Sequence, residues 1–166
     1  MNNQLEINSF ITSGRFRNIA INVFSENIDQ SDFGNLDSED CDIVYKSSNK
    51  EHFSLIYKKN KLKIKSNSIV FCHTDYVEEF FGLIKKNGSI NNLILITSQS
   101  DKSVNKKLWN SKPESISKWF AINSEVENEN LINIPLGLGN SFSKKNINIE
   151  DLNNLNKSLF IKEDIS

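Results

Sequence analysis

The sequence predicts an α/β fold in which a mostly parallel sheet is flanked by helices, in a Rossmann-like arrangement. Two observations lead to this fold class. Three short apolar runs rich in β-branched residues, SIVFC (68–72), LILIT (93–97) and LINIPLG (131–137), are typical of buried strands. Patterns predicted as helices, at 76–84 and 115–121, lie between them. Because such an alternation joins neighbouring strands by right-handed crossovers, we expect the sheet to be mostly parallel.

The N-terminal region, residues 1–66, is strongly patterned in charge and is expected to be β-rich. Residues 25–42 carry seven acids and no base among many Ser, Asp and Asn residues, so we expect loops and turns there. Residues 46–65 carry seven lysines and one acid, and apolar and lysine positions partly alternate in FSLIYKK and KLKIK. This pattern predicts the strands of a hairpin. Its lysines either cover a solvated face or form a patch for an anionic ligand or partner.

The longer helix is predicted between the first two apolar runs. Its apolar face is formed by Tyr76, Val77, Phe80, Phe81 and Ile84. Thr74 or Asp75 can cap the start of this helix, and Asn87-Gly88 ends it.

Length and composition predict one globular domain. A chain of 166 residues with 37% hydrophobic residues is long enough to bury a core. Its apolar runs are too short to cross a bilayer, and its start lacks the basic and apolar regions of a secretory signal. Two cysteines do not make a disulfide framework, so we expect a cytoplasmic protein. A net charge of −1 gives no electrostatic basis for binding nucleic acid.

Polar loops follow each predicted strand. Ligands of open α/β sheets bind beyond the carboxyl ends of the strands, and this rule selects residues 73–75, 98–101 and 137–140. The third loop contains Gly137, Gly139 and Asn140. It either brings backbone amides to a sugar or phosphate or forms a tight turn, and it lacks the third glycine of a dinucleotide-binding motif.

Residues 69–140 resemble a group of bacterial and phage glycosyltransferase-like proteins of the exostosin type. Four segments carry the resemblance: IVFCHTDYVEEFFGLI, LILITSQSD, ISKWFAINSEV and LINIPLGLGN. In that group the second segment usually contains Thr-His-Asn-Ser-Asp, whereas this chain has Thr97-Ser98-Gln99-Ser100-Asp101. If the absent histidine takes part in the chemistry, this chain has lost the activity or moved the role to another residue.

The resemblance implies a glycosyltransferase of the two-domain GT-B type, active in polysaccharide biosynthesis. This chain would supply the N-terminal half: the charged region 1–66, the core 67–142 and a polar segment, 143–166, that can link to a second Rossmann-like domain. The implied partners are a carbohydrate acceptor or a sugar nucleotide as co-substrate. We expect no metal and no further cofactor.

Glycosyl transfer with inversion needs a carboxylate or a histidine that takes the proton of the acceptor hydroxyl. Asp101 and Asp75 are candidate bases, and each has an alternative role as a helix cap. His73 can serve as the base or assist it, or it can be a structural hydrogen-bonding residue.

Polar residues near these candidates are expected to bind substrate. They are Ser98, Gln99, Ser100 and Asn123, with Gly137, Gly139 and Asn140 of the third loop. Asn123 lies near Trp119-Phe120, an aromatic pair that fits the core better than a sugar-stacking platform. The only two arginines, Arg15 and Arg17, either bind phosphate or carboxylate or pair with the acidic stretch.

The sequence leaves two functions open. The first is a glycosyltransferase-like domain that binds a sugar acceptor or a sugar nucleotide at the strand ends. The second is a non-catalytic Rossmann-like module that binds a glycan or a partner without turnover.

Overall fold

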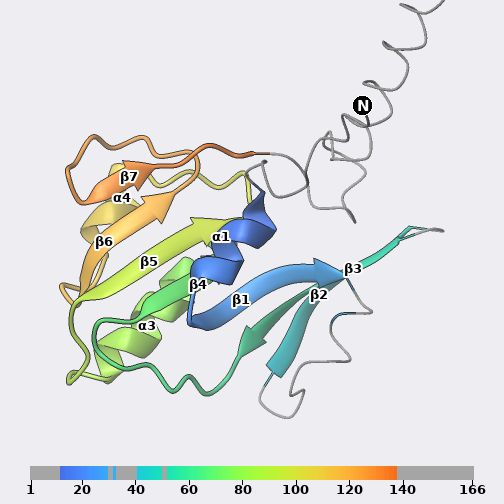
Figure 1. The fold of residues 1–166 in the computed structure, drawn as a ribbon, viewed down its shortest axis with the longest axis horizontal. Helices are drawn as coiled ribbons and strands as arrows, with labels where there is room; N and C mark the ends of the chain where they lie inside the picture. Colours follow the sequence, from blue (N-terminus) through green and yellow to red (C-terminus); the bar gives the residue numbers. More distant parts are fainter. Residues whose placement is uncertain (1–11, 30–31, 33–40, 50–51, 138–166) are drawn as a thin grey trace, which may run out of the picture.

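The protein is an α/β domain built on a mixed, mostly parallel sheet of seven strands (Figure 1). The computed structural model describes residues 12–29, 32, 41–49 and 52–137. The strands are β1 (Asn22–Asp29), β2 (Cys41–Asn49), β3 (His52–Lys59), β4 (Ile69–His73), β5 (Leu93–Ser98), β6 (Ile116–Ala121) and β7 (Leu131–Asn133). Their order is β2-β3-β1-β4-β5-β6-β7. Strands β1, β4, β5, β6 and β7 are parallel, whereas β3 is antiparallel to both β1 and β2.

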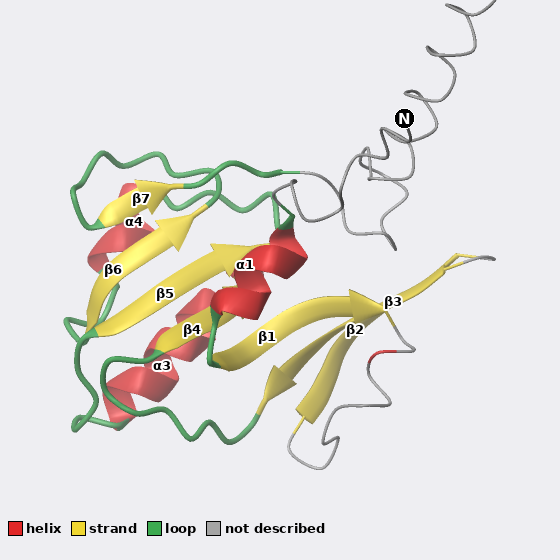
Figure 2. Ribbon diagram, viewed as in Figure 1, coloured by secondary structure: helices red, strands yellow, loops and turns green. Residues whose placement is uncertain are grey.

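Helices cover both faces of this sheet (Figure 2). They are α1 (Ser13–Ile19), the short 3-10 helix η3 (Thr74–Tyr76), α3 (Val77–Lys86) and α4 (Lys106–Asn110). Helices α3 and α4 contribute Phe80, Phe81 and Leu108 to one apolar cluster, which includes Trp119 of the sheet. On the other face, Phe16 of α1 packs against a second cluster. The sheet thus lies between two apolar layers, as the α/β pattern of the sequence predicts.

Helix α3 confirms the predicted helix between the first two apolar runs. Its buried residues are Val77, Phe80, Phe81 and Ile84, and it ends at Lys86 with Asn87 as C-cap. The predicted caps are wrong, because neither Thr74 nor Asp75 caps α3. Both lie inside η3, whose N-cap is His73.

The short helix predicted at 115–121 is wrong, because this segment forms strand β6. Ile116, Trp119 and Ala121 are buried and Lys118 is exposed, a spacing that a short segment can show in either conformation. The segment is a strand because it lies between β5 and β7 and is hydrogen-bonded to both. The short helix is instead α4, which begins where the Asn105 side chain accepts a hydrogen bond from the Leu108 amide at 3.0 Å.

Two expectations for the charged N-terminal region also need correction. The start of the acidic stretch is not a loop, because Ser25–Asp29 lie in β1, where Ser25 and Glu26 are buried. The rest of that stretch, apart from Asp32 and the first residues of β2, lies outside the described residues. A hairpin is present, but β2 and β3 form it, so of the two predicted strands only FSLIYKK, in β3, is confirmed. KLKIK (61–65) is not a strand.

The order of the strands makes the carboxyl ends of β1 and β4 the point at which the connections of the sheet diverge. From β1 the chain turns to the β2–β3 hairpin on one side, and from β4 it continues to β5 on the other side. The two connections therefore diverge at the boundary between β1 and β4. Ligands of open α/β sheets bind at such divergence points.

Candidate functional site

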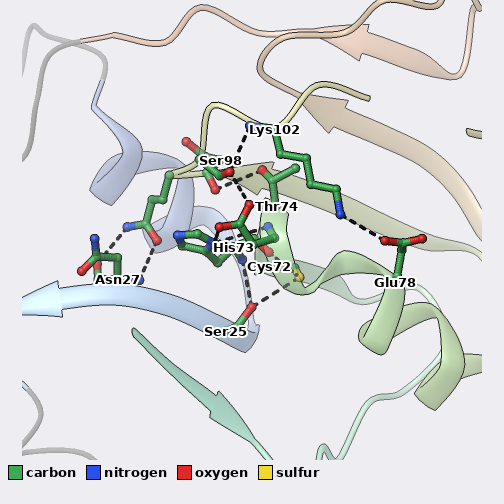
Figure 3. Close-up of polar contacts among 11 residues, drawn as sticks. Ser25, Asn27, Cys72, His73, Thr74, Glu78, Ser98 and Lys102 are labelled. Carbon is green, nitrogen blue, oxygen red and sulfur yellow. Dashed lines mark hydrogen bonds and ion pairs between the residues drawn. The ribbon is translucent and has the colours of Figure 1, made fainter. Parts of the chain in front are cut away.

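Two of the three predicted loops meet at this edge, as their positions after neighbouring strands predict. His73 of β4 and Ser98 of β5 are partners in the parallel register. The Thr74 hydroxyl donates to the Ser98 carbonyl at 3.2 Å, and the Ser100 hydroxyl donates to Asp75 Oδ1 at 2.5 Å. Figure 3 shows His73, Thr74 and Ser98 gathered beside Ser25 of β1.

His73 is buried, with 3% of its side chain exposed. Its Nδ1 accepts a hydrogen bond from the Asp75 amide at 3.4 Å, so the neutral ring carries its proton on Nε2. Burial lowers the pKa of His73 below its usual value, while the Asp75 carboxylate and a hydrogen bond with the Gln99 backbone oppose that shift. A buried neutral imidazole whose Nδ1 is already occupied orients the turn more readily than it takes a proton from a ligand.

Asp75 is the carboxylate best placed to meet a ligand. Half of its side chain is exposed, and its Oδ2 lies 3.9 Å from His73 Nδ1. Ser100 fixes the other oxygen, and the Ser100 hydroxyl itself accepts from the Lys102 amide at 3.0 Å. One oxygen of the Asp75 carboxylate is therefore bound by Ser100, and the other lies near the His73 ring. This is an arrangement suited to a general base.

Gln99 links the loop after β5 to β1. Its Oε1 accepts from the Asn27 amide at 2.8 Å, and its Nε2 donates to the Asn27 carbonyl at 3.0 Å. Its backbone is in the left-handed region, with φ of 69°. Because both ends of the amide are engaged, Gln99 acts here as a clamp between β1 and the loop, and its predicted contact with substrate stays a prediction.

Buried polar groups are concentrated at this edge of the sheet. Of the seven buried polar or charged residues in the described part of the chain, six lie near the ends of β1, β4 and β5: Ser25, Glu26, His73, Thr74, Thr97 and Ser98. Most have partners in the protein. The Ser25 hydroxyl, for example, accepts from the His73 amide at 3.0 Å and lies 3.4 Å from Cys72 Sγ. Burial raises the pKa of that thiol to about 12, so Cys72 stays protonated and unreactive.

Two buried oxygens among the described residues have no hydrogen-bond partner, and both belong to this edge. They are Asn27 Oδ1 on β1 and Ser98 Oγ at the end of β5. Ser98 is fully buried. Leaving a buried polar atom without a partner costs about 1–3 kcal/mol, so a hydrogen bond from a ligand or a water molecule to either of these oxygens would be stabilising.

A second polar group lies beside this site and was not predicted. The carboxylate of Glu26 accepts from the Tyr57 hydroxyl at 3.0 Å and from Arg17 Nε at 3.2 Å. Burial raises the pKa of Glu26, and the Arg17 charge and these hydrogen bonds oppose the shift. The contact confirms that Arg17 pairs with the acidic stretch. Neither Glu26 nor Asn27 has a signature in the sequence, because the composition around them is typical of loops.

The remaining predicted residues do not join this cluster. Asp101 is exposed, has no hydrogen-bond partner among the described residues and caps no helix. Asn123 is exposed, with φ of 54°, and its carbonyl accepts from the Val104 amide at 3.0 Å. Gly137 is exposed with φ of 73°, whereas Gly139 and Asn140 lie outside the described residues.

The aromatic pair belongs to the core rather than to a sugar platform. Trp119 is fully buried, stacks on Trp109 and donates from Nε1 to the Thr97 hydroxyl at 2.8 Å. Phe120 packs against the cluster under α1. Within residues 12–29, 32, 41–49 and 52–137, no group of three or more His, Cys, Asp and Glu residues is arranged to hold a metal ion. In the same residues no helix is long and apolar enough to span a membrane.

Comparison with known proteins gives no match: no family model, no curated protein and no solved structure matches this chain. The resemblance to exostosin-type glycosyltransferases therefore rests on the four sequence segments alone.

Proposed function

We propose that this chain is a glycosyltransferase-like domain that holds a sugar, as acceptor or as part of a sugar nucleotide, at the carboxyl ends of β1, β4 and β5. The parallel sheet and the diverging connections at β1 and β4 are compatible with one Rossmann-like half of a GT-B enzyme. The sequence segments that resemble that group include the two loops that form this site.

One observation carries the proposal, namely the two buried oxygens without partners, Asn27 Oδ1 and Ser98 Oγ. Asn27 offers a hydrogen-bond acceptor and Ser98 offers a hydroxyl that donates or accepts. Sugar hydroxyls also donate and accept, so they are chemically suited to pair with either group. Asp75 belongs to the same pair of loops as Ser98, because it is bonded to Ser100 and the preceding Thr74 donates to the Ser98 carbonyl, and this supports a role for its carboxylate next to a sugar bound there.

In the catalytic form of the proposal, Asp75 takes the proton of an acceptor hydroxyl. As that oxygen forms its bond to the anomeric carbon, the bond from this carbon to the nucleoside diphosphate breaks, and the diphosphate leaves with the electron pair. His73 is a positioning residue, because its Nδ1 holds the Asp75 amide. This assignment moves the role of the absent histidine at position 98 or 99 to Asp75.

The burial of His73 favours a second candidate function, a sugar-binding module without turnover. The histidine that the sequence offers for proton transfer is 3% exposed and has Nδ1 engaged. In that case Asp75 would only bind a sugar hydroxyl. Its replacement would weaken sugar binding, and the native chain itself would show no transfer activity.

The test is a thermal-shift screen of the purified chain against UDP, GDP, CMP and their sugars, and against free sugars. A ligand at 100 times its Kd stabilises the folded state by about 2.7 kcal/mol, which for a chain of this size is a rise in Tm of roughly 5–10 °C. Ligands that shift Tm are then assayed for transfer with the native chain and with Asp75→Asn. Loss of transfer with retained binding supports Asp75 as base.

Ser98→Ala makes the test specific to the site. Because Ser98 Oγ has no partner, the free variant should be as stable as the native chain or up to about 1 kcal/mol more stable, while the ligand-induced rise in Tm shrinks. Ser117→Ala is the matched control. Its hydroxyl donates to the Leu93 carbonyl at 3.1 Å, far from the site, so it should lose stability and keep the ligand effect. Equal ligand effects in both variants would contradict the proposed position.

A further inference from the structure

The opposite, amino edge of the sheet presents lysines. The segment 61–65 runs along this edge between β3 and β4 (Figure 2). Lys63 and Lys65 are exposed, whereas Leu62 and Ile64 between them pack against the core under α3. The apolar side chains thus anchor the segment, and the alternation directs the lysines away from the core.

Two more lysines belong to the same edge. Lys85 and Lys86 form the exposed last turn of α3. The loop after α3 is bonded to the turn after residue 65: the Asn67 amide donates to the Asn91 carbonyl at 3.1 Å, and the Asn91 amide donates to Ser66 Oγ at 3.1 Å. Neither 60–74 nor 80–100 contains an acidic residue. The acids on either side of these lysines are Asp42, which pairs with Lys58 near the end of β3, and Glu114, which precedes the Ser115 carbonyl that accepts from the Leu93 amide at 2.7 Å.

Exposed aliphatic side chains accompany these lysines. Ile21 is 76% exposed and Ile19 is 57% exposed, among the few large hydrophobic residues that are exposed in the described part of the chain. The Ile21 amide donates to the Ile69 carbonyl at 3.1 Å, which fixes Ile21 at the start of β4, directly after the lysine-bearing segment. The amino edge therefore combines lysines with one exposed aliphatic side chain, that of Ile21.

We propose that the amino edge, defined by Lys63, Lys65, Lys85, Lys86 and Ile21, docks the protein on an anionic membrane surface. Lysines are attracted to acidic headgroups, and exposed aliphatic side chains gain by entering the headgroup region. Nucleic acid fits this edge less well. The edge carries neither of the arginines, which would bind phosphate bidentately, and an exposed aliphatic side chain gains from entering a headgroup region rather than from a phosphate backbone.

The test is sedimentation of the full chain with vesicles of phosphatidylcholine alone and of phosphatidylcholine mixed with phosphatidylglycerol. The native chain should bind only the mixed vesicles and should dissociate when salt is raised from about 0.1 M to about 1 M. Each lysine near the surface is worth about a fivefold change in affinity, so Lys63→Glu/Lys65→Glu should weaken binding at least ~20-fold. Ile21→Ser should weaken binding without changing its salt dependence.

Lys106→Glu/Lys107→Glu is the matched control, with the same change of charge on the exposed side of α4. Its binding should stay within about threefold of the native chain, since only the net charge has changed. If Lys63→Glu/Lys65→Glu does not fold, as judged by its melting curve, Lys85→Glu/Lys86→Glu tests the same edge. The proposal is overturned by absence of binding to the mixed vesicles, by equal loss in the α4 control, or by tighter binding to duplex RNA than to vesicles. None of these outcomes bears on sugar binding at the opposite edge.

Discussion

Replacing Gln99 tests the clamp that joins the loop after β5 to β1. In the native chain the Gln99 side chain makes two hydrogen bonds with the Asn27 backbone, at 2.8 and 3.0 Å. A hydrogen bond of this kind contributes about 1 kcal/mol net, so Gln99→Ala should lower the free energy of unfolding by about 2 kcal/mol. The loss can be somewhat larger, because Asn27 NH and CO are partly shielded from water and would lose their partners.

Gln99→Gly provides the matched comparison, because the backbone of residue 99 has φ of 69°. Glycine adopts this conformation without the steric cost of a side chain, an advantage of about 0.5–1 kcal/mol after the greater freedom of glycine in the unfolded chain is included. Gln99→Gly should therefore be more stable than Gln99→Ala, although both lack the clamp. Urea denaturation followed by circular dichroism measures the three free energies. A loss below about 0.5 kcal/mol for Gln99→Ala, or a glycine variant less stable than the alanine variant, would refute the assigned role.

Three further substitutions test the residues around the site. Asp101→Asn should change the free energy of unfolding by less than about 0.5 kcal/mol, since Asp101 is exposed and caps no helix, and urea denaturation would expose any hidden structural role. Because burial lowers the pKa of His73 below its unfolded value of 6.5, the unfolded chain binds more protons near and below pH 6.5, and stability should fall as pH drops from about 7.5 to about 5.5. His73→Asn keeps an acceptor for the Asp75 amide and should flatten that slope, and an unchanged slope would show that His73 does not cause it. Tyr57→Phe removes the hydroxyl bound to the buried Glu26 and should cost about 1–3 kcal/mol at pH 7, a loss that chemical denaturation would measure and that a value near zero would contradict.

The sequence predicts the centre of this fold better than its edges. The runs at 68–72 and 93–97 are apolar on both faces, and only a strand buried between two layers needs that composition, so β4 and β5 could be identified. The turns after these strands, with His73, Asp75, Ser98 and Ser100, could be placed together because parallel neighbours end at the same edge. Ile116–Ala121 could not be assigned, because six residues fit the period of a short helix and of a strand.

The residues of the site on β1 could not be predicted from the sequence, for a different reason. Glu26 and Asn27 stand in an acidic, Ser- and Asn-rich stretch whose composition is typical of loops. The Glu26 carboxylate is bound by Arg17 of α1 and Tyr57 of β3. Both residues belong to other elements, and Tyr57 is also distant from Glu26 in the chain. Asn27 is held by Gln99, 72 residues away. Such partners become visible only when the strands are placed side by side.

The most direct test of the proposed site is the set of backbone amide chemical shifts recorded while a sugar nucleotide that raises Tm is titrated into the isotope-labelled chain. Binding at the carboxyl edge should perturb the amides of 25–27, 73–75 and 97–101 and leave those of 61–67 and 85–92 unchanged. Ser98→Ala should reduce these perturbations at a given ligand concentration. Saturable perturbations confined to the amino edge or to α4, with the residues at the ends of β1, β4 and β5 unmoved, would contradict the site proposed for this protein.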